Sequence, residues 1–102
     1  MIDKCNDADE EIAQFFQHVE TNNVKEVQRC IDLNPSIAYE VNDGMETILH
    51  VAVVRKHIEM VEYLLEQDFG KHLAKAKDLR RMTPVDVSKF MKQVQIIKVF
   101  KE

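Results

Sequence analysis

One pattern occurs three times along this chain of 102 residues, and it limits the fold more than any other feature of the sequence. Segment 47–65 carries the pattern in full, as a Thr-x-Leu-His opening followed by an apolar run and then an amphipathic stretch. The amphipathic stretch recurs at 23–31, which is 34 residues earlier, and the opening recurs at 83–88, which is 36 residues later. A repeat of this length predicts a solenoid in which each unit buries its apolar face against a neighbour.

Each unit is expected to contain two short helices. Apolar residues recur at helical spacing over 7–20, 24–33, 58–67 and 93–101. Asp7 or Asp9 is the expected N-cap of the first helix, where carboxylates favour the positive end of the helix dipole. Connectors at 37–46 and 71–82 separate the units, and the second has room for one extra helical turn at Leu73-Ala74. The predicted fold class is therefore all-α.

The segment Thr47-Ile48-Leu49-His50-Val51-Ala52 resembles the T-P-L-H-x-A opening of ankyrin repeats, and Thr83-Pro84-Val85 begins a second copy. The resemblance implies an ankyrin-like solenoid of stacked helix–loop–helix repeats. It also implies one domain over 1–102, with units at about 7–36, 43–70 and 78–102.

The chain departs from the ankyrin pattern at three positions. Ala13 stands where the first unit would need a threonine, which fits an N-terminal capping repeat with a polar outer face. Lys56 and Lys92 stand where the family usually has glycine between the paired helices. A non-glycine residue held there at positive φ costs about 1 kcal/mol.

The residue types that carry chemistry do not form a reaction centre. His50 and His57 are seven residues apart, a rise of about 10 Å in a helix and too far to share a metal ion. The resemblance implies instead that His50 ties adjacent loops by hydrogen bonds. Cys30 falls on a predicted core face rather than in an exposed, positively charged site. We expect no enzyme activity, no metal and no cofactor, because the glycine-rich phosphate-binding motifs are also missing from the sequence.

The charge is distributed unevenly. Residues 1–70 carry 15 acidic and 5 basic side chains, whereas residues 71–102 carry 9 basic and 3 acidic ones. The basic connector 71–81 leaves open a second function, the binding of anionic lipid or nucleic acid. Against it stand the isoelectric point near 5.5 and the lack of aromatic residues among the basic ones.

The last helix leaves open a third function, self-association. If Val94, Ile97 and Phe100 pack inward, then Ile96 and Val99 have no following unit to cover them. An uncovered apolar edge predicts a homodimer through residues 94–100 or a protein that covers it.

The leading expectation is non-enzymatic protein binding, by an adaptor, inhibitor or regulatory subunit. The ankyrin resemblance implies a concave groove and loop tips as the binding surface. The residues that match these positions are Asp43, Met45, Glu46, Val51, Val54, Arg55, Leu79, Arg80, Arg81, Met82, Val87 and Met91. The polar, acidic start lacks the basic and apolar segments of a secretory signal, so we expect a cytoplasmic or nuclear protein.

Overall fold

A computed structural model describes the backbone of residues 3–101 and the side chains of residues 10–100. Within this range the chain forms α-helices and one 3-10 helix and has no strand, so the predicted all-α fold is confirmed. The elements are α1 (Asp3–Glu20), α2 (Val24–Leu33), η1 (Pro35–Tyr39), α3 (Ile48–Val54), α4 (Ile58–Glu66), α5 (Gly70–Lys75), α6 (Pro84–Phe90) and α7 (Val94–Lys101).

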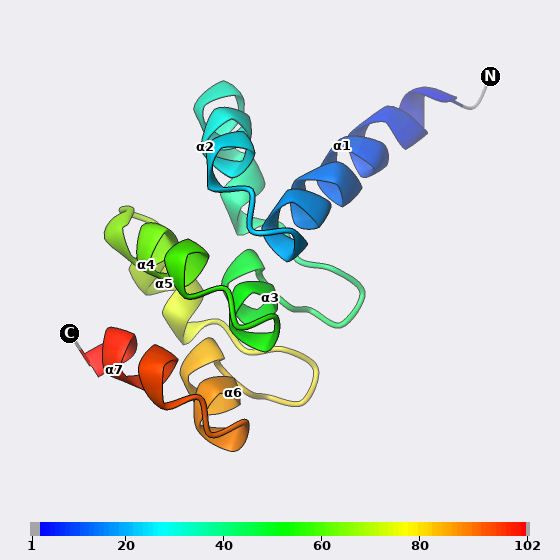
Figure 1. The fold of residues 1–102 in the computed structure, drawn as a ribbon. Coiled ribbons are helices and arrows are strands. Elements are labelled where there is room, and N and C mark those ends of the chain that lie inside the picture. Colours follow the sequence, from blue (N-terminus) through cyan, green and yellow to red (C-terminus); the bar gives the residue numbers. More distant parts are fainter. Residues whose placement is uncertain (1–2, 102) are drawn as a thin grey trace.

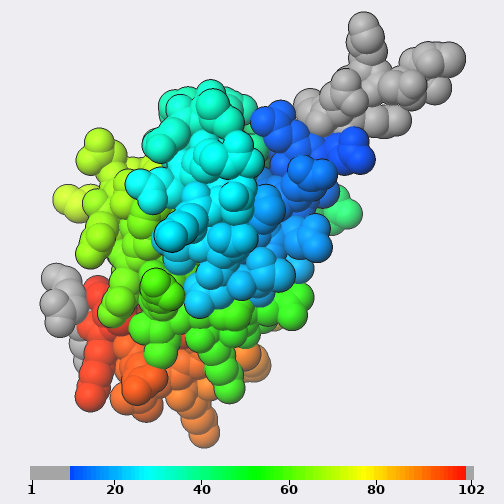
Figure 2. Space-filling view, turned by 45° about the horizontal axis from the view of Figure 1, so that its top comes forward, coloured from blue at the N-terminus to red at the C-terminus, as the bar shows by residue number. Residues whose placement is uncertain are grey.

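The helices form three stacked pairs, α1–α2, α3–α4 and α6–α7 (Figure 1). One layer contains α1, α3 and α6, with α3 packed between the other two. The second layer contains α2, α4 and α7, and the extra helix α5 lies beside α4. Connectors 40–47 and 76–83 project from the opposite side of the first layer. Figure 2 shows the first pair at one end of the molecule and the third pair at the other.

The turns between paired helices follow the sequence closely. Asn22, Lys56 and Lys92 have φ angles of 60°, 61° and 55°, so both lysines adopt the left-handed conformation that the usual glycine would take. Asn23 caps α2 by accepting a hydrogen bond from the amide of Glu26. The start of α1 differs from the sequence prediction, because the helix begins at Asp3 rather than near Asp7.

The segments predicted as connectors, 37–46 and 71–82, overlap with helices that their sequences do not fully indicate. The 3-10 helix η1 begins at Pro35 and buries Ile37 and Ala38 against the core. Helix α5 begins at Gly70 and buries Leu73, where only one extra turn was predicted. Gly70 is required by close packing, since a Cβ atom there would lie 2.5 Å from the carbonyl oxygen of Leu64. Apolar burial rather than turn composition therefore decides the conformation of both segments.

The middle helix pair supplies much of the core because it is covered from both sides. Leu49 and Val53 of α3 and Met60, Val61 and Leu64 of α4 have no exposed surface. Helices α1 and α6 pack on opposite sides of α3, and α7 packs on α4. Each pair alone would leave these side chains in water, so the stack is the unit of stability.

Helix α7 packs in a register that the sequence analysis did not predict. Ile96 is 1% exposed and Val94 is 61% exposed, so the expectation that Val94 packs inward and Ile96 lacks cover is wrong. Val99 and Phe100 are partly buried against the core. Ile96 lies 36 residues after Met60 and occupies the equivalent position of the third repeat. Met60 is buried in its own unit, and Ile96 is buried for the same reason. Ile96 is therefore not available to a second copy of the chain.

Candidate functional site

The first connector is closed by one asparagine side chain. The Oδ1 atom of Asn42 accepts hydrogen bonds from the amides of Gly44 and Glu46, each at 3.0 Å. The amide of Asn42 donates to the carbonyl of Glu46 at 3.0 Å, and the amide of Met45 donates to the carbonyl of Asn42 at 2.9 Å. Met45 at the tip has a φ of 62° and is 47% exposed. The loop is thus a rigid turn that holds a methionine outward.

The second connector has the same hydrogen bonds, 36 residues later. The Oδ1 atom of Asp78 accepts from the amides of Arg80 at 2.8 Å and Met82 at 3.0 Å. The amide of Arg81 donates to the carbonyl of Asp78 at 2.9 Å, and Arg81 has a φ of 64°. Leu79, also at the tip, is 69% exposed. Two different sequences therefore form one loop geometry.

His50 connects the two loops from the core. Its Nδ1 atom accepts from the amide of Thr47 at 3.1 Å, which leaves Nε2 to donate to the carbonyl of Met82 at 2.7 Å. A direct backbone bond, from the amide of Leu79 to the carbonyl of Gly44 at 3.0 Å, joins the loops as well. The predicted structural role of His50 is confirmed.

The charged side chains of the loops fall into two groups. Arg80 is held in place by Asp78 at 3.1 Å and Glu46 at 3.9 Å. Asp43 and Arg81 are exposed and make no ion pair with any residue that the structure describes. Arg80 is thus partly structural, whereas Asp43 and Arg81 present opposite charges to solvent.

The side chain of Asp78 is only 1% exposed, yet its environment favours the ionised form. Burial of the carboxyl group is the largest single influence and opposes ionisation, but the hydrogen bonds from the Met82 amide, the Arg80 side chain and the Arg80 amide outweigh it in sum. Together with the charge of the Arg80 guanidinium they hold the pKa of Asp78 below its ordinary value. The second loop therefore depends on a buried carboxylate where the first uses a neutral amide.

The helix residues assigned to this surface need correction. Val51 and Val87 are 7% and 2% exposed, so the expectation that they face a groove is wrong. Both side chains lie in the core between first-layer helices, where a partner cannot reach them. Val54 and Met91 are 37% and 38% exposed and remain accessible. Arg55 is also exposed and lies 3.7 Å from Glu20.

Sequence reasoning missed the most exposed apolar residue on this side of the molecule. Phe90 is 74% exposed at the end of α6, and it lies 36 residues after Val54, which ends α3. Val54 was assigned to this surface from the ankyrin resemblance, and the repeat offset of 36 residues applied to it would also have identified Phe90. Val41, at the base of the first connector, was missed as well and is 37% exposed.

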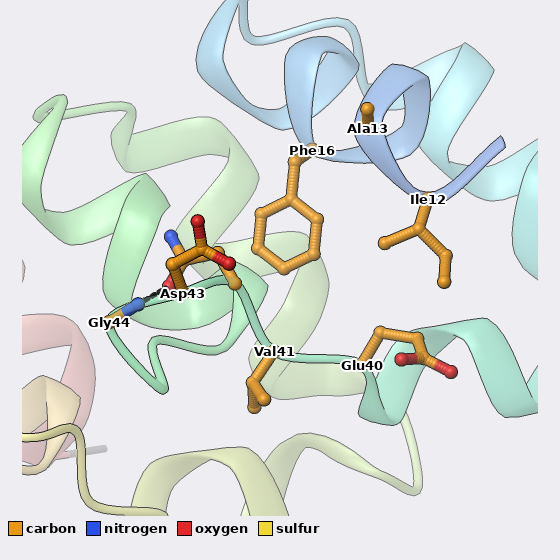
Figure 3. Close-up of a pocket in the computed structure, with 8 residues that line it drawn as sticks. Ile12, Ala13, Phe16, Glu40, Val41, Asp43 and Gly44 are labelled. Carbon is orange, nitrogen blue, oxygen red and sulfur yellow. Dashed lines mark hydrogen bonds between the residues drawn. The ribbon is translucent and has the colours of Figure 1, made fainter. Parts of the chain in front are cut away.

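A cavity of about 680 Å³ lies between α1 and the first connector (Figure 3). Its lining residues are Ile12, Ala13, Phe16, Glu40, Val41, Asn42, Asp43 and Gly44. The α1 side of the cavity is apolar, and the connector side carries two carboxylates. The repeat pattern gave no signal for it, because the cavity depends on how α1 packs against the first connector.

The described residues hold no arrangement typical of a metal or nucleophilic centre. Within them, no group of three or more His, Cys, Asp or Glu side chains is placed to hold a metal ion. Burial raises the pKa of the Cys30 thiol, which disfavours the reactive thiolate. The Nε2 atom of His57 donates a hydrogen bond to the carbonyl of Glu20 at 2.6 Å, which ties two turns together. None of the helices in the described range is long and apolar enough to cross a membrane.

Comparison with known proteins agrees with this architecture. A family model described as ankyrin repeats (many copies) matches residues 14–65, which is just over half of the chain. No curated protein matches the chain. The match covers most of the first helix pair, the first connector and most of the second pair. The third pair begins with the same capping box as the second, formed by Thr83 and Asp86.

Proposed function

The chain belongs to the ankyrin-repeat family, and we propose that it binds another protein through the side of the array that carries its two connectors. We name this side the connector surface. It consists of the exposed residues Val41, Asp43, Met45, Val54, Arg55, Leu79, Arg80, Arg81, Phe90 and Met91, together with the half-buried Glu46 and Met82. Ankyrin repeats are generally protein-interaction modules, and they act by occupying a partner's surface.

The distribution of exposed apolar side chains is the observation that carries this proposal. Nine large apolar residues are exposed among those that the structure describes, and six of them belong to the connector surface. Leu79 and Phe90 are the most exposed of the six, at 69% and 74%. Apolar groups gathered on one side of a small protein mark an interaction site.

The backbone at the loop tips supports the same surface. Met45 and Arg81 are held at positive φ, where a residue with a side chain costs about 1 kcal/mol relative to glycine. Both side chains point to solvent and are not needed for the core. Strain of this kind is typical of functional sites, where the side chain serves a purpose other than folding.

The charges of the tips define the partner further. Asp43 lies at the first tip and Arg81 at the second, so a partner that spans both presents a basic group beside an acidic one. Such a pattern fixes the direction in which the partner lies along the array. We place the protein in the cytoplasm or nucleus as an adaptor, inhibitor or regulatory subunit.

The arrangement of the basic residues of 71–81 favours a protein partner over a polyanion. Lys71 and Lys75 lie on α5 beside α4, whereas the tip with Arg81 projects on the opposite side of the first layer (Figure 1). Arg80 is already paired with Asp78 and Glu46. These cations therefore do not form the single continuous patch that phosphate groups require.

Site-specific photo-crosslinking tests the proposal. A photoreactive phenylalanine analogue replaces Leu79, which is 69% exposed, and a matched variant carries it at Leu33, which is 74% exposed but ends α2 in the second layer. We expect one protein to crosslink strongly from position 79 and weakly from position 33 in the native cell extract. Equal crosslinking from both positions, or crosslinking from position 33 alone, would show that the connector surface is not the binding site.

A further inference from the structure

The cavity between α1 and the first connector combines an apolar wall with an acidic rim. Ile12 and the ring of Phe16 point from α1 toward the connector, and Glu40 and Asp43 lie on either side of them (Figure 3). Val41 adds apolar surface from the connector itself. We name this cavity the α1 pocket. Its volume of about 680 Å³ is large enough for an aromatic side chain and its neighbours.

The two carboxylates of the α1 pocket have no cationic partner in the described part of the chain. Neither Glu40 nor Asp43 takes part in an ion pair there, and no lysine or arginine lines the pocket. An occupant without positive charge would remove water from these carboxylates without supplying a counter-charge, and this is energetically unfavourable. The pocket therefore suits an apolar side chain that is flanked by lysine or arginine.

The chain itself carries such a segment at the opposite end of the array. Lys89, Phe90, Met91 and Lys92 are consecutive and all exposed, with Phe90 at 74%. Neither lysine forms an ion pair with a described residue. Phe90 is the last residue of α6, and the chain turns at Lys92, which has a positive φ, before α7 begins. We name residues 89–92 the α6 knob.

We infer that the α6 knob of one molecule binds in the α1 pocket of a second copy. Phe90 would pack against the accessible side chains of Ile12 and Val41, above Phe16, which is only 6% exposed, and Lys89 and Lys92 would neutralise Glu40 and Asp43. The long-range charge distribution favours the same contact, since residues 1–70 have a net charge of −10 and residues 71–102 one of +6. Pocket and knob are different surfaces, so the contact forms a closed dimer if it is reciprocal and a longer chain if it is not.

This self-contact is separate from the proposed binding of another protein, but it involves the same side of the molecule. Asp43 and Phe90 belong to both surfaces. Occupation of the α1 pocket by a second copy would therefore compete with a partner for the connector surface. Low ionic strength should strengthen the self-contact, because salt screens the four charges that it joins.

Sedimentation velocity at increasing protein concentration and low salt tests the inference. We expect the wild-type chain to associate and Phe90→Ala to weaken the association at least tenfold, as for a central aromatic anchor. Leu33→Ala, which removes an equally exposed side chain from the second layer, should leave the dissociation constant unchanged. A wild-type chain that stays monomeric at all concentrations overturns the inference, and so does equal association of Phe90→Ala and wild type.

A charge exchange tests the identity of the two surfaces. The double variants Glu40→Lys/Asp43→Lys and Lys89→Glu/Lys92→Glu should each fail to associate alone, because pocket and knob then carry the same sign. An equimolar mixture of the two should associate again, because each pocket meets a knob of opposite charge. Circular dichroism confirms that both variants fold. Association of either variant alone at the wild-type level, or no recovery in the mixture, would rule out this contact.

Discussion

The two connectors have the same backbone and present different chemistry. Asn42 and Asp78 close their loops with the same pair of side-chain hydrogen bonds, and Met45 and Arg81 occupy the same positive φ. The exposed tips, however, carry an acid and a methionine in the first loop and a leucine and an arginine in the second. The closing residues are determined by the fold, and the tip residues are free to serve recognition.

A second difference lies in how each loop is anchored to the helix that follows it. Thr47 and His50 form the capping box of α3, and His50 also reaches the second connector through the carbonyl of Met82. Thr83 and Asp86 form the capping box of α6, and Asp86 is exposed. The first anchor therefore joins two repeats, whereas the second stabilises one helix.

Replacing His50 should give the largest effect of the substitutions that separate the two loops. His50→Leu leaves the amide of Thr47 without a partner, at a cost of about 1–3 kcal/mol, and removes the inter-repeat hydrogen bond to the carbonyl of Met82, worth about 1 kcal/mol, although that carbonyl still accepts from the amide of Asp78. We expect a loss of about 2–4 kcal/mol in the free energy of unfolding, measured by urea denaturation. Asp86→Ala should cost only about 0.5–1 kcal/mol, because it weakens an exposed cap. Equal losses would show that the inter-repeat bond has no energetic role.

The closing residues should differ by a smaller amount. Asn42→Ala removes two neutral hydrogen bonds from loop amides and one from its Nδ2 atom to the Glu46 carboxylate, worth about 1–2 kcal/mol together, whereas Asp78→Ala removes two charge-assisted amide bonds and the ion pair with Arg80, worth about 2–3 kcal/mol. Asp78→Asn should restore most of the loss by imitating the first loop. Thermal melts of the three variants check this order. A melt of Asp78→Asn as low as that of Asp78→Ala would contradict the idea that one amide can replace the carboxylate.

Acid should destabilise the second loop through Asp78. The pKa of Asp78 is lowered in the folded state, so its contribution to stability is complete above the ordinary carboxyl pKa of about 3.9. That contribution is lost as the pH falls through the lowered value, because the unfolded state then binds the proton more readily. The difference in stability between wild type and Asp78→Asn should therefore shrink below about pH 4. A difference that is constant from pH 7 to pH 2 would contradict this prediction.

The smallest expected effect is a gain in stability at the loop tips. Met45→Gly and Arg81→Gly relieve the positive φ, and part of that gain is offset by the greater freedom of glycine in the unfolded chain. We expect each variant to gain about 0.5 kcal/mol, as measured in urea. Leu79→Gly is the matched control, because Leu79 is an exposed tip residue without positive φ. If Leu79→Gly also increases the free energy of unfolding, the increase at Met45 and Arg81 cannot be attributed to relief of their positive φ.

Much of the fold could be predicted because it depends on short-range patterns. The bounds of α2, the capping role of Thr47 and the positive φ of Lys56 all follow from local sequence. Helices η1 and α5 could not be predicted in full, since they form to bury Ile37 and Leu73 against residues distant in the chain. Local propensity alone does not contain that information.

The candidate site was less predictable than the fold. The ankyrin pattern located the loop tips correctly in space, but it placed Val51 and Val87 on the surface when neighbouring helices bury them. Phe90 lies 36 residues after Val54, so the repeat offset was sufficient to predict that it belongs to the same surface. The α1 pocket depends on how α1 and the first connector pack together. The residue spacing in the sequence does not determine the distance between these two elements.

The central claim is that opposite charges on two equivalent loops orient a protein partner. Single charge reversals at the exposed tips, Asp43→Lys and Arg81→Glu, test it without disturbing the paired Arg80. Stopped-flow association with the crosslinked partner, at two salt concentrations, should show slower association and a weaker salt dependence for both variants. Their unfolding in urea should match the wild type. Association unaltered by either reversal, or accelerated by Asp43→Lys, would contradict the account.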